Sequence, residues 1–224
     1  MRNIMKILCQ MSGGADSVLA ACRAKEQYPN ADLYGIFIDY GQVAAQAEET
    51  TAQKVVERLG LVNLKVVTVR NLYNGGVNSV PDDKEGVDGK LSAVYTPLRN
   101  VALMGITAAH AAVIGADMIV TGNKGIEQIE GDPYSFKDST RKFHELSEIL
   151  INATLEEGGI RVNQILSNTL AKKMTKKDVY AELLGYGFRY DATFSCFYPV
   201  DGKECGECHN CIEKKLIFKE LNNE

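Results

Sequence analysis

The fold is decided at Ile4-Met5-Lys6-Ile7-Leu8-Cys9 and at Ser12-Gly13-Gly14-Ala15-Asp16-Ser17, which follows after two intervening residues. The first run is apolar enough to form a buried strand, and the apolar residues after Ser17 recur with helical spacing. A strand that leads through a glycine turn directly into a helix is typical of an α/β fold. In such folds ligands bind at the carboxyl ends of the parallel strands, which is where this turn is expected.

Apolar patterning along the rest of the chain alternates between strand-like and helix-like segments. It predicts strands at residues 33–38, 64–69, 118–120 and 160–166, and helices at residues 43–59, 101–114, 141–155 and 175–184. This order predicts a doubly wound, mostly parallel, Rossmann-like α/β sheet with helices on both faces. We expect this domain to span residues 1–189, with a small cysteine-rich segment, residues 190–224, packed on it. Residues 71–97 have glycines and prolines without clear periodicity, which predicts a functional lid or a mobile segment.

The composition is that of an ordinary globular protein, with 45% apolar and 24% charged residues among 224. The net charge of −4 argues against broad electrostatic binding of nucleic acid, which needs a basic surface. No stretch approaches the ~20 apolar residues of a membrane span. The amino terminus lacks the apolar core and cleavage site of a signal peptide. We therefore expect a cytoplasmic protein that binds small molecules rather than a membrane or a nucleic acid.

The glycine turn has the chemistry of an anion site. Gly13 and Gly14 let the backbone approach a phosphate closely, and free amides at a helix start favour negative charge. Ser12 and Ser17 add hydroxyl donors, and Asp16 fits if it meets a magnesium ion carried by a nucleotide. The plainer alternative is a strand-to-helix turn in which Ser or Asp caps the helix. The chain lacks the spacing of a Walker loop and of a dinucleotide fingerprint.

Four cysteines crowd together near the carboxyl end: Cys196, Cys205, Cys208 and Cys211. In a cytosolic chain such clustering indicates metal binding rather than disulfides. Four thiolates, with two pairs spaced Cys-x-x-Cys, match a closed structural zinc site, although an iron–sulfur cluster uses similar spacing. Gly206 suits the tight turn between ligands, and His209 is expected to face solvent rather than the metal.

The turn resembles the pyrophosphate loop of the ATP pyrophosphatases, which cleave ATP between its α and β phosphates. The chain as a whole resembles the 7-cyano-7-deazaguanine synthase (QueC) family. The resemblance covers nearly the full length through motifs in the same order: Ser12–Ser17, Asp39-Tyr40-Gly41-Gln42 with Glu48 after it, Pro97-Leu98-Arg99-Asn100, Gly122-Asn123, and Ser195-Cys196 with the cysteine cluster. Several motifs in order are more specific than any one of them.

The resemblance implies a reaction in which ATP activates the carboxylate of 7-carboxy-7-deazaguanine, ammonia displaces AMP, and a second ATP converts the amide to a nitrile. It implies ATP, Mg²⁺ and Zn²⁺ as cofactors and a homodimer, to which Phe194, Phe197 and Tyr198 contribute unless they pack internally. The implied catalytic residues are Ser12, Asp16, Ser17, Arg99 and Lys124. The implied nucleotide-binding residues are Met11, Ser12, Gly13, Gly14, Ala15, Asp16, Ser17, Asp39, Gln42 and Gly122. The implied substrate-binding residues are Tyr40, Arg99, Asn100, Phe136 and Asp138.

Some features depart from the family's pattern or favour plainer interpretations. Residues 132–141 keep the family's register only at Asp138, with Phe136 in place of a tyrosine, so substrate recognition is less well matched than adenylation. Asp138 can also be a simple helix cap, and the lysines between residues 172 and 177 are most simply a solvated surface. Two alternatives to the synthase remain: an enzyme that adenylates another carboxylate or a tRNA base, and a nucleotide-binding module without turnover.

Overall fold

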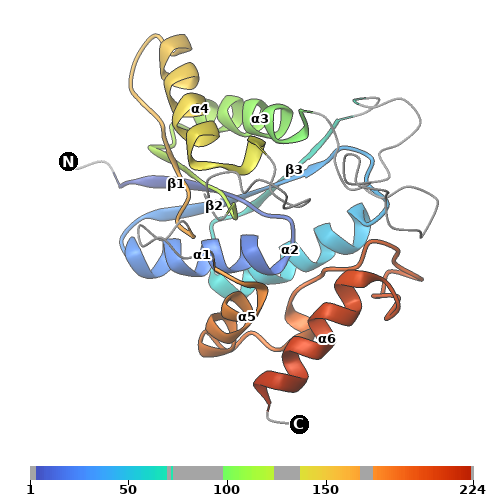
Figure 1. Cartoon of the computed structure of the whole chain (residues 1–224). Helices are drawn as coiled ribbons and strands as arrows, with labels where there is room; N and C mark the ends of the chain where they lie inside the picture. Colours follow the sequence, from blue (N-terminus) through green and yellow to red (C-terminus); the bar gives the residue numbers. More distant parts are fainter. Residues whose placement is uncertain (1–3, 70–71, 73–97, 124–136, 167–173, 223–224) are drawn as a thin grey trace.

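The protein is described here from a computed structural model, in which residues 4–69, 72, 98–123, 137–166 and 174–222 are placed (Figure 1). At its centre lies a parallel sheet of five strands. The strands are β1 (Lys6–Gln10), β2 (Asp32–Asp39), β3 (Leu64–Thr68), β4 (Met118–Val120) and β5 (Arg161–Asn163). A parallel sheet needs both faces covered, because each strand is joined to the next by a crossover.

The strand order is β3-β2-β1-β4-β5. The chain first winds outward from β1 to β3 and then returns to the other side of β1, so that β1 and β4 are neighbours, with Leu8 paired to Ile119. The direction of winding therefore reverses between β1 and β4. Ligands of doubly wound folds bind outside the carboxyl ends of the strands at such a reversal.

Helices cover both faces of the sheet. On one face lie α3 (Arg99–Ile114) and α4 (Arg141–Thr154), which is preceded by the short helix η1 (Lys137–Ser139). On the other face lie α1 (Ala15–Gln27) and α2 (Ala45–Leu59), and a further layer beyond them contains α5 (Lys176–Gly185) and α6 (His209–Leu221), joined through η2 (Tyr190–Ala192) (Figure 1). The sheet thus separates α3 and α4 from the other four long helices.

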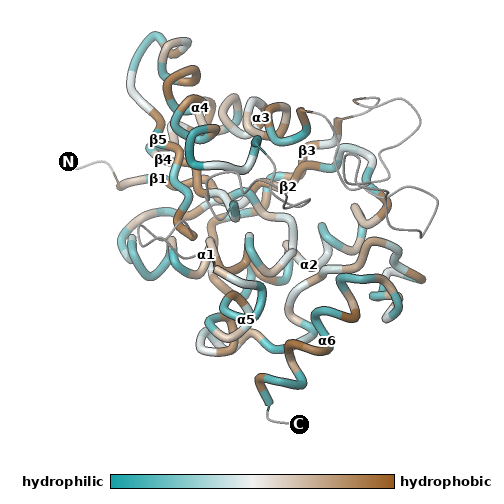
Figure 2. Tube along the Cα trace, in the orientation of Figure 1, coloured by the Kyte–Doolittle hydropathy of each residue, from teal (hydrophilic) through white to brown (hydrophobic). Residues whose placement is uncertain are grey.

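Each face of the sheet has its own apolar core. Ile7 and Cys9 of β1 point toward α1, α2, α5 and α6. Leu8 of the same strand points toward α3 and α4, as the alternation of side chains along a strand requires. Ile217 and Phe218 of α6 belong to the same core as β1, so the carboxyl-terminal helix is part of the main fold. Figure 2 shows the matching alternation of hydrophobic and hydrophilic residues along α6.

The sequence predicted the parallel sheet and its flanking helices, and the structure confirms them. Gly60 and Gly115 take left-handed conformations at the ends of α2 and α3, and Thr175 and Asp178 form the expected capping box at the start of α5. The strand predicted at residues 160–166 is shorter, and α6 was not predicted at all. The predicted lid at residues 71–97 lies outside the described residues, apart from Leu72. Among the described residues, no helix has the length and apolar character needed to cross a membrane.

Candidate active site

The glycine turn joins β1 to α1 at the reversal of the sheet, as the sequence predicted. Gly14 is the N-cap of α1, and no side chain caps the helix. The hydroxyl of Ser17 donates to the carbonyl of Gly14 at 2.9 Å, and the N–H of Ser12 donates back to Ser17 Oγ at 3.2 Å. The two hydroxyls of Ser12 and Ser17 lie 3.1 Å apart. The two serine hydroxyls therefore lie together at the amino-terminal end of α1, where free backbone amides favour an anion such as phosphate.

Two glycines allow neighbouring backbone segments to touch this turn. Gly13 has φ +71°, and a Cβ there would lie 2.7 Å from the carbonyl oxygen of Glu48 in α2. At Gly122, just after β4, a Cβ would lie 2.7 Å from the backbone nitrogen of Ser17. The atoms in the way are backbone atoms, which cannot swing aside as a flexible side chain would. Both positions therefore require glycine, and Gly122 brings the end of β4 against the start of α1.

Asp16 forms an ion pair with Lys176, which lies in the first turn of α5. Burial alone would lower the pKa of Lys176, but the charge of Asp16 and its hydrogen bond outweigh this effect and raise that pKa. The expectation that the lysines near residue 176 form only a solvated surface is therefore wrong for Lys176. Lys177 does face solvent, where it pairs with Glu220, and Lys172 and Lys173 lie outside the described residues.

Asp39, Tyr40 and Gln42 lie at the carboxyl end of β2, next to the glycine turn. The carboxylate of Asp39 accepts the N–H of Gly41 at 2.9 Å, and Gln42 Oε1 accepts the N–H of Tyr40 at 2.9 Å. Gln42 is buried, and its amide nitrogen donates to Glu48 Oε2 at 3.0 Å. Gln42 thus shapes this turn from inside.

Glu48, which the sequence analysis noted without a role, lies in α2 beneath the turn after β2. Burial raises its pKa, although the hydrogen bond from Gln42 and the positive charge of Arg99 act in the opposite direction. The charge of Arg99 is therefore close enough to α2 to act on a carboxyl group there. This places the amino-terminal end of α3 at the same edge of the sheet as the glycine turn.

The start of α3 holds Arg99 and Asn100 beside η1. Leu98, the N-cap, has φ +57°, which is rare for a residue with a branched side chain and marks a tightly constrained turn. Asn100 Nδ2 donates to the carbonyl oxygen of Asp138 at 3.0 Å. The alternative of Asp138 as a helix cap is wrong, because Thr140 caps α4 by accepting the N–H of Phe143 at 3.2 Å. The predicted Lys124 and Phe136 lie outside the described residues.

The four cysteines of the predicted metal site come together. The sulfur atoms of Cys196, Cys205, Cys208 and Cys211 all lie within 4.8 Å of one another. A tetrahedral zinc ion with Zn–S bonds of ~2.3 Å holds its sulfurs about 3.8 Å apart, so the cluster fits a single ion of this kind. The N–H groups of Tyr198 and Cys205 donate to Cys196 Sγ at 3.3 and 3.2 Å, which favours a thiolate there. His209 is exposed and outside the cluster, as predicted.

The thiol pKa values indicate how unfavourable four ionised cysteines would be without a cation. Burial raises the pKa of Cys196 to about 11 and also raises the pKa of Cys211. At Cys205 burial acts in the same direction, but the N–H groups of Glu207 and Cys208 lower the pKa to about 7. Four neighbouring thiolates repel one another, and a divalent metal removes that cost. The donor set therefore fits a structural metal.

The cysteine cluster is connected to the glycine turn through the backbone. The N–H of Phe194, two residues before Cys196, donates to the carbonyl of Gly13 at 2.9 Å. Lys214 of α6, only 1% exposed, donates to Thr193 O at 2.7 Å and to Glu204 Oε1 at 2.9 Å. Phe194 itself packs in the small core around the cysteines, so it is an internal packing residue.

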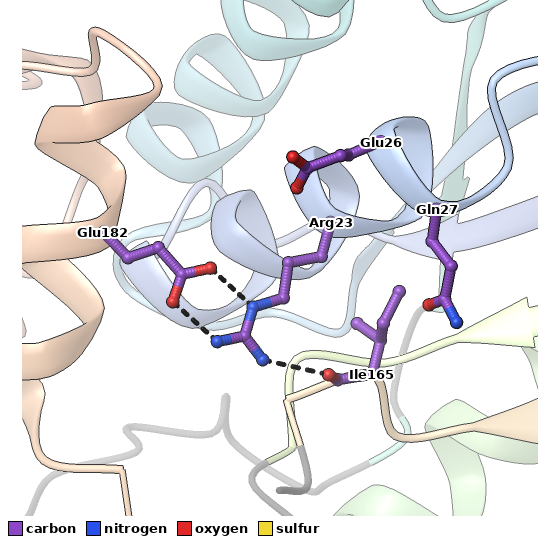
Figure 3. A pocket seen from close by; sticks show the side chains of 5 residues that line it. All are labelled: Arg23, Glu26, Gln27, Ile165 and Glu182. Carbon is purple, nitrogen blue, oxygen red and sulfur yellow. Dashed lines mark hydrogen bonds and ion pairs between the residues drawn. The ribbon is translucent and has the colours of Figure 1, made fainter.

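A separate polar pocket lies farther along α1 (Figure 3). It is lined by Arg23, Glu26, Gln27, Ile165 and Glu182. Both carboxylate oxygens of Glu182 accept hydrogen bonds from Arg23 at 2.6 Å, and Ile165 O accepts a third at 3.2 Å. The guanidinium of Arg23 thus already donates hydrogen bonds to groups within the protein. None of the predicted site residues that the structure describes lines the pocket.

Comparison with known proteins identifies the family. The family model described as "Queuosine biosynthesis protein QueC" matches residues 6–222. The chain belongs to the QueC family. Its relatives include proteins named 7-cyano-7-deazaguanine synthase from Methanococcus aeolicus and Acidobacterium capsulatum. The first is 30% identical, with 98% of this chain and 97% of the relative covered, and the second is 29% identical, with 96% and 92% covered.

The fold also matches a solved structure outside the QueC family. The U34-tRNA thiolase NcsA from Methanococcus maripaludis superposes with a TM-score of 0.52 at 17% identity, covering 99% of this chain and 73% of that one. At this identity the likeness concerns the fold alone. It agrees with the doubly wound α/β fold that the sequence predicted.

Of the site residues, the structure brings Ser12–Ser17, Asp39–Gln42, Arg99, Asn100, Gly122 and Asp138 to one edge of the sheet. Sequence reasoning missed Lys176 and left His144 without a role. A signal for Lys176 did exist, because the capping box at Thr175 places the next residue in the first turn of a helix.

Proposed function

We propose that this QueC-family protein converts 7-carboxy-7-deazaguanine and ammonia to 7-cyano-7-deazaguanine at the expense of two ATP molecules. The observation that carries the proposal is the glycine turn at the reversal of the sheet, held against α2 by Gly13 and against β4 by Gly122. Such a cradle suits the pyrophosphate of a nucleotide. The family match over residues 6–222 supports the synthase over other enzymes with this loop.

The chemistry explains why ATP is consumed twice. A carboxylate is a poor electrophile, so one oxygen attacks the α-phosphorus of ATP and expels pyrophosphate, which leaves an acyl adenylate. Ammonia then adds to the carbonyl carbon and AMP departs with the first oxygen, giving an amide. The amide oxygen attacks a second ATP in the same way. Loss of both protons from nitrogen and of AMP from carbon then forms the nitrile.

The residues of the glycine turn are proposed to hold ATP. Backbone amides from Met11 to Ser17 and the hydroxyls of Ser12 and Ser17 bind the pyrophosphate, while Asp39, Gln42 and Gly122 shape the nucleotide pocket. Asp16 would hold Mg²⁺, which offsets negative charge on the departing pyrophosphate. Lys176 is close enough to Asp16 to orient its carboxylate. Arg99 and Lys124 are proposed to stabilise the same developing charge.

Recognition of the deazapurine is proposed to involve Tyr40, Arg99, Asn100, Phe136 and Asp138. Asn100 already binds the backbone of Asp138, which supports a shared role for the start of α3 and for η1. The departures from the family's pattern at residues 132–141 make this part of the proposal the most informative to test.

The cysteine cluster is proposed to bind Zn²⁺ as a structural ion. All four sulfurs lie within 4.8 Å of one another, which suits one tetrahedral ion better than an iron–sulfur cluster, whose thiolates bind separate iron atoms. Residues 190–224 would then form a segment anchored by the metal on a domain of residues 1–189. With four protein ligands the ion has no open position for catalysis.

A cytoplasmic homodimer is proposed for the assembled enzyme. Phe194 is buried within the chain, whereas Phe197 and Tyr198 are half-buried. Large apolar side chains are more exposed on α3 and α4, where Val113, Leu146, Ile149 and Leu150 face solvent. Exposed apolar surface of this kind favours association with another copy.

The test is incubation of the metal-loaded protein with ATP, Mg²⁺, ammonium and 7-carboxy-7-deazaguanine. We expect mass spectrometry to show the nitrile, with two AMP formed for each nitrile. An amide that accumulates, or AMP without any nitrile, would mean that the chemistry stops early or serves another acceptor. No AMP from folded, metal-loaded protein would refute the synthase function.

A further inference from the structure

A buried histidine lies beside the candidate active site, in the layer of helices opposite to the cysteine cluster. His144 in α4 is 2% exposed, and none of the proposed chemical steps uses it. Its ring contacts three polar side chains from different segments: Thr121 and Asn123, which flank Gly122, and Gln164, which follows β5. A fully buried polar ring with so many partners is costly unless each contact is satisfied.

Two groups face the Nδ1 nitrogen of His144. The carbonyl oxygen of Thr140 lies 2.9 Å from Nδ1 and can only accept, and the amide nitrogen of Gln164 also contacts Nδ1 but donates to that same carbonyl at 3.2 Å. We therefore assign the proton to Nδ1. A neutral ring then has a lone pair on Nε2. That lone pair faces the carboxamide nitrogen of Asn123 and the hydroxyl of Thr121, each at 3.2 Å, and both can donate. Burial lowers the pKa of His144 to about 4, so the ring is neutral at physiological pH.

This arrangement determines the direction of the Asn123 side chain. Because the Nδ2 amino group of Asn123 donates to His144, its carbonyl oxygen Oδ1 points away from the ring. No hydrogen bond to Oδ1 is formed by any residue that the structure describes. Asn123 follows Gly122, whose backbone touches the start of α1. An oriented acceptor therefore lies next to the glycine turn.

We propose that His144 is a positioning residue, which holds Asn123 so that its carbonyl oxygen accepts an N–H or O–H group of a bound ligand. The inference rests on the proposed function, because either the nucleotide or the deazapurine can supply such a donor. A histidine that only filled space would not need an acceptor nitrogen aimed at Asn123. The Nε2 contact is therefore the feature to remove selectively.

Two substitutions separate the two ring nitrogens. In H144N the side chain amide can still donate to Thr140 O in place of Nδ1, but nothing replaces Nε2. In H144Q the longer side chain puts its carbonyl oxygen near the Nε2 position, so it can still accept from Asn123. His110, half-buried on α3, provides the matched control H110N. Loss of one oriented hydrogen bond to a ligand corresponds to about a tenfold effect.

The experiment measures MgATP affinity by calorimetry without the second substrate, and then KM and kcat with both substrates. We expect H144N and N123A each to lower the MgATP affinity or to raise the KM for the deazapurine about tenfold. H144Q and H110N should keep values near those of the wild type. A weaker MgATP affinity assigns the donor to the nucleotide, and a raised KM for the deazapurine alone assigns it to the base. In the double variant H144N/N123A we expect no further loss beyond N123A, since His144 acts through Asn123.

Other outcomes would overturn the inference. One is that the MgATP affinity, KM and kcat are unchanged in H144N and N123A. Another is that H144Q shows the same loss as H144N. A third is that the losses of H144N and N123A add fully in the double variant. A readout that needs no activity is the ¹⁵N NMR spectrum of the three histidines. It should show one neutral ring protonated on Nδ1, whose Nε2 signal shifts in N123A. If that signal is present but the wild type makes no nitrile, the proposed function fails while the positioning of Asn123 stands.

Discussion

The two layers of helices hold the same edge of the sheet by different means. On the side of α1, α2, α5 and α6, the glycine turn is held by backbone contacts, by the Asp16–Lys176 ion pair and by the N–H of Phe194 next to the cysteine cluster. On the side of α3 and α4, the segment after β4 is held by the buried polar network around His144. The first side depends on glycine and on the proposed metal, and the second on neutral hydrogen bonds.

The difference indicates which kind of change would disrupt each side. A backbone that fits only glycine tolerates no side chain, and four thiolates repel one another without a metal, so the first side is sensitive to an added Cβ and to loss of the metal. A network of neutral groups fails when one of them gains a proton. Metal removal and glycine substitution should therefore act on the first side, and protonation of His144 on the second.

Metal removal should have the largest effect. Replacing Cys208 with alanine should release the metal and lower the free energy of unfolding on the order of 5 kcal/mol, because structural metal binding contributes directly to folding. Metal content and thermal unfolding are the measurements, with Cys22→Ala as control, since Cys22 is buried in the main core instead. Hydrogen exchange should speed up in α6 and residues 193–211. Equal loss of protection in α3 and α4 would contradict the separation of the two sides.

Protonation of His144 should act on the other side. The pKa of His144 is about 4 in the folded protein, below its value of ~6.5 in an unfolded chain. The unfolded state therefore binds a proton first, so stability is full above pH ~6.5 and falls as the pH drops toward 4, by up to about 3 kcal/mol. Denaturant unfolding of the wild type and H144Q at pH 7 and pH 4 checks this. H144Q should lose less stability than the wild type, and parallel losses would show that other groups account for the effect.

Substitution of Gly122 should reduce activity more than stability. In Gly122→Ala the new Cβ meets the backbone of Ser17, so the end of β4 and the start of α1 must separate. We expect AMP formation to fall about a hundredfold, equivalent to ~2.7 kcal/mol. Gly105→Ala is the matched control, because a Cβ there meets nothing within 4 Å. Similar activity of both variants would mean that the contact of Gly122 with α1 does not position the turn.

Removal of Lys176 should have the smallest effect. In Lys176→Met the Asp16 carboxylate loses its partner, and we expect kcat/KM for ATP to fall about tenfold, as for loss of one charge-assisted hydrogen bond. Lys177→Met is the neighbouring control, because Lys177 and Glu220 are 51% and 61% exposed and such pairs contribute little. If the two variants behave alike, Lys176 is a surface lysine, as the sequence had suggested.

Local patterns in the sequence predicted most of the fold and the glycine turn. Ser12–Ser17 and the four cysteines are short motifs whose chemistry can be inferred without knowing their neighbours. Lys176 and Asp16 are 160 positions apart, so their pairing depended on the packing of α5 against α1. His144 gathers Thr121, Asn123 and Gln164 from three segments, and no spacing along the chain indicates such a network. Helix α6 has no clear apolar periodicity, because the charged Lys214 is buried on the same face as Cys211, Ile217 and Phe218.

The central claim is that both oxygens of the substrate carboxylate leave on AMP. The most direct measurement starts from 7-carboxy-7-deazaguanine with ¹⁸O in both carboxylate positions and follows the label by mass spectrometry. The account predicts an unlabelled nitrile and two AMP, each with one ¹⁸O in its phosphate, while pyrophosphate stays unlabelled. Label in pyrophosphate, in inorganic phosphate or in water, or AMP free of ¹⁸O, would contradict adenylation of the substrate at the glycine turn.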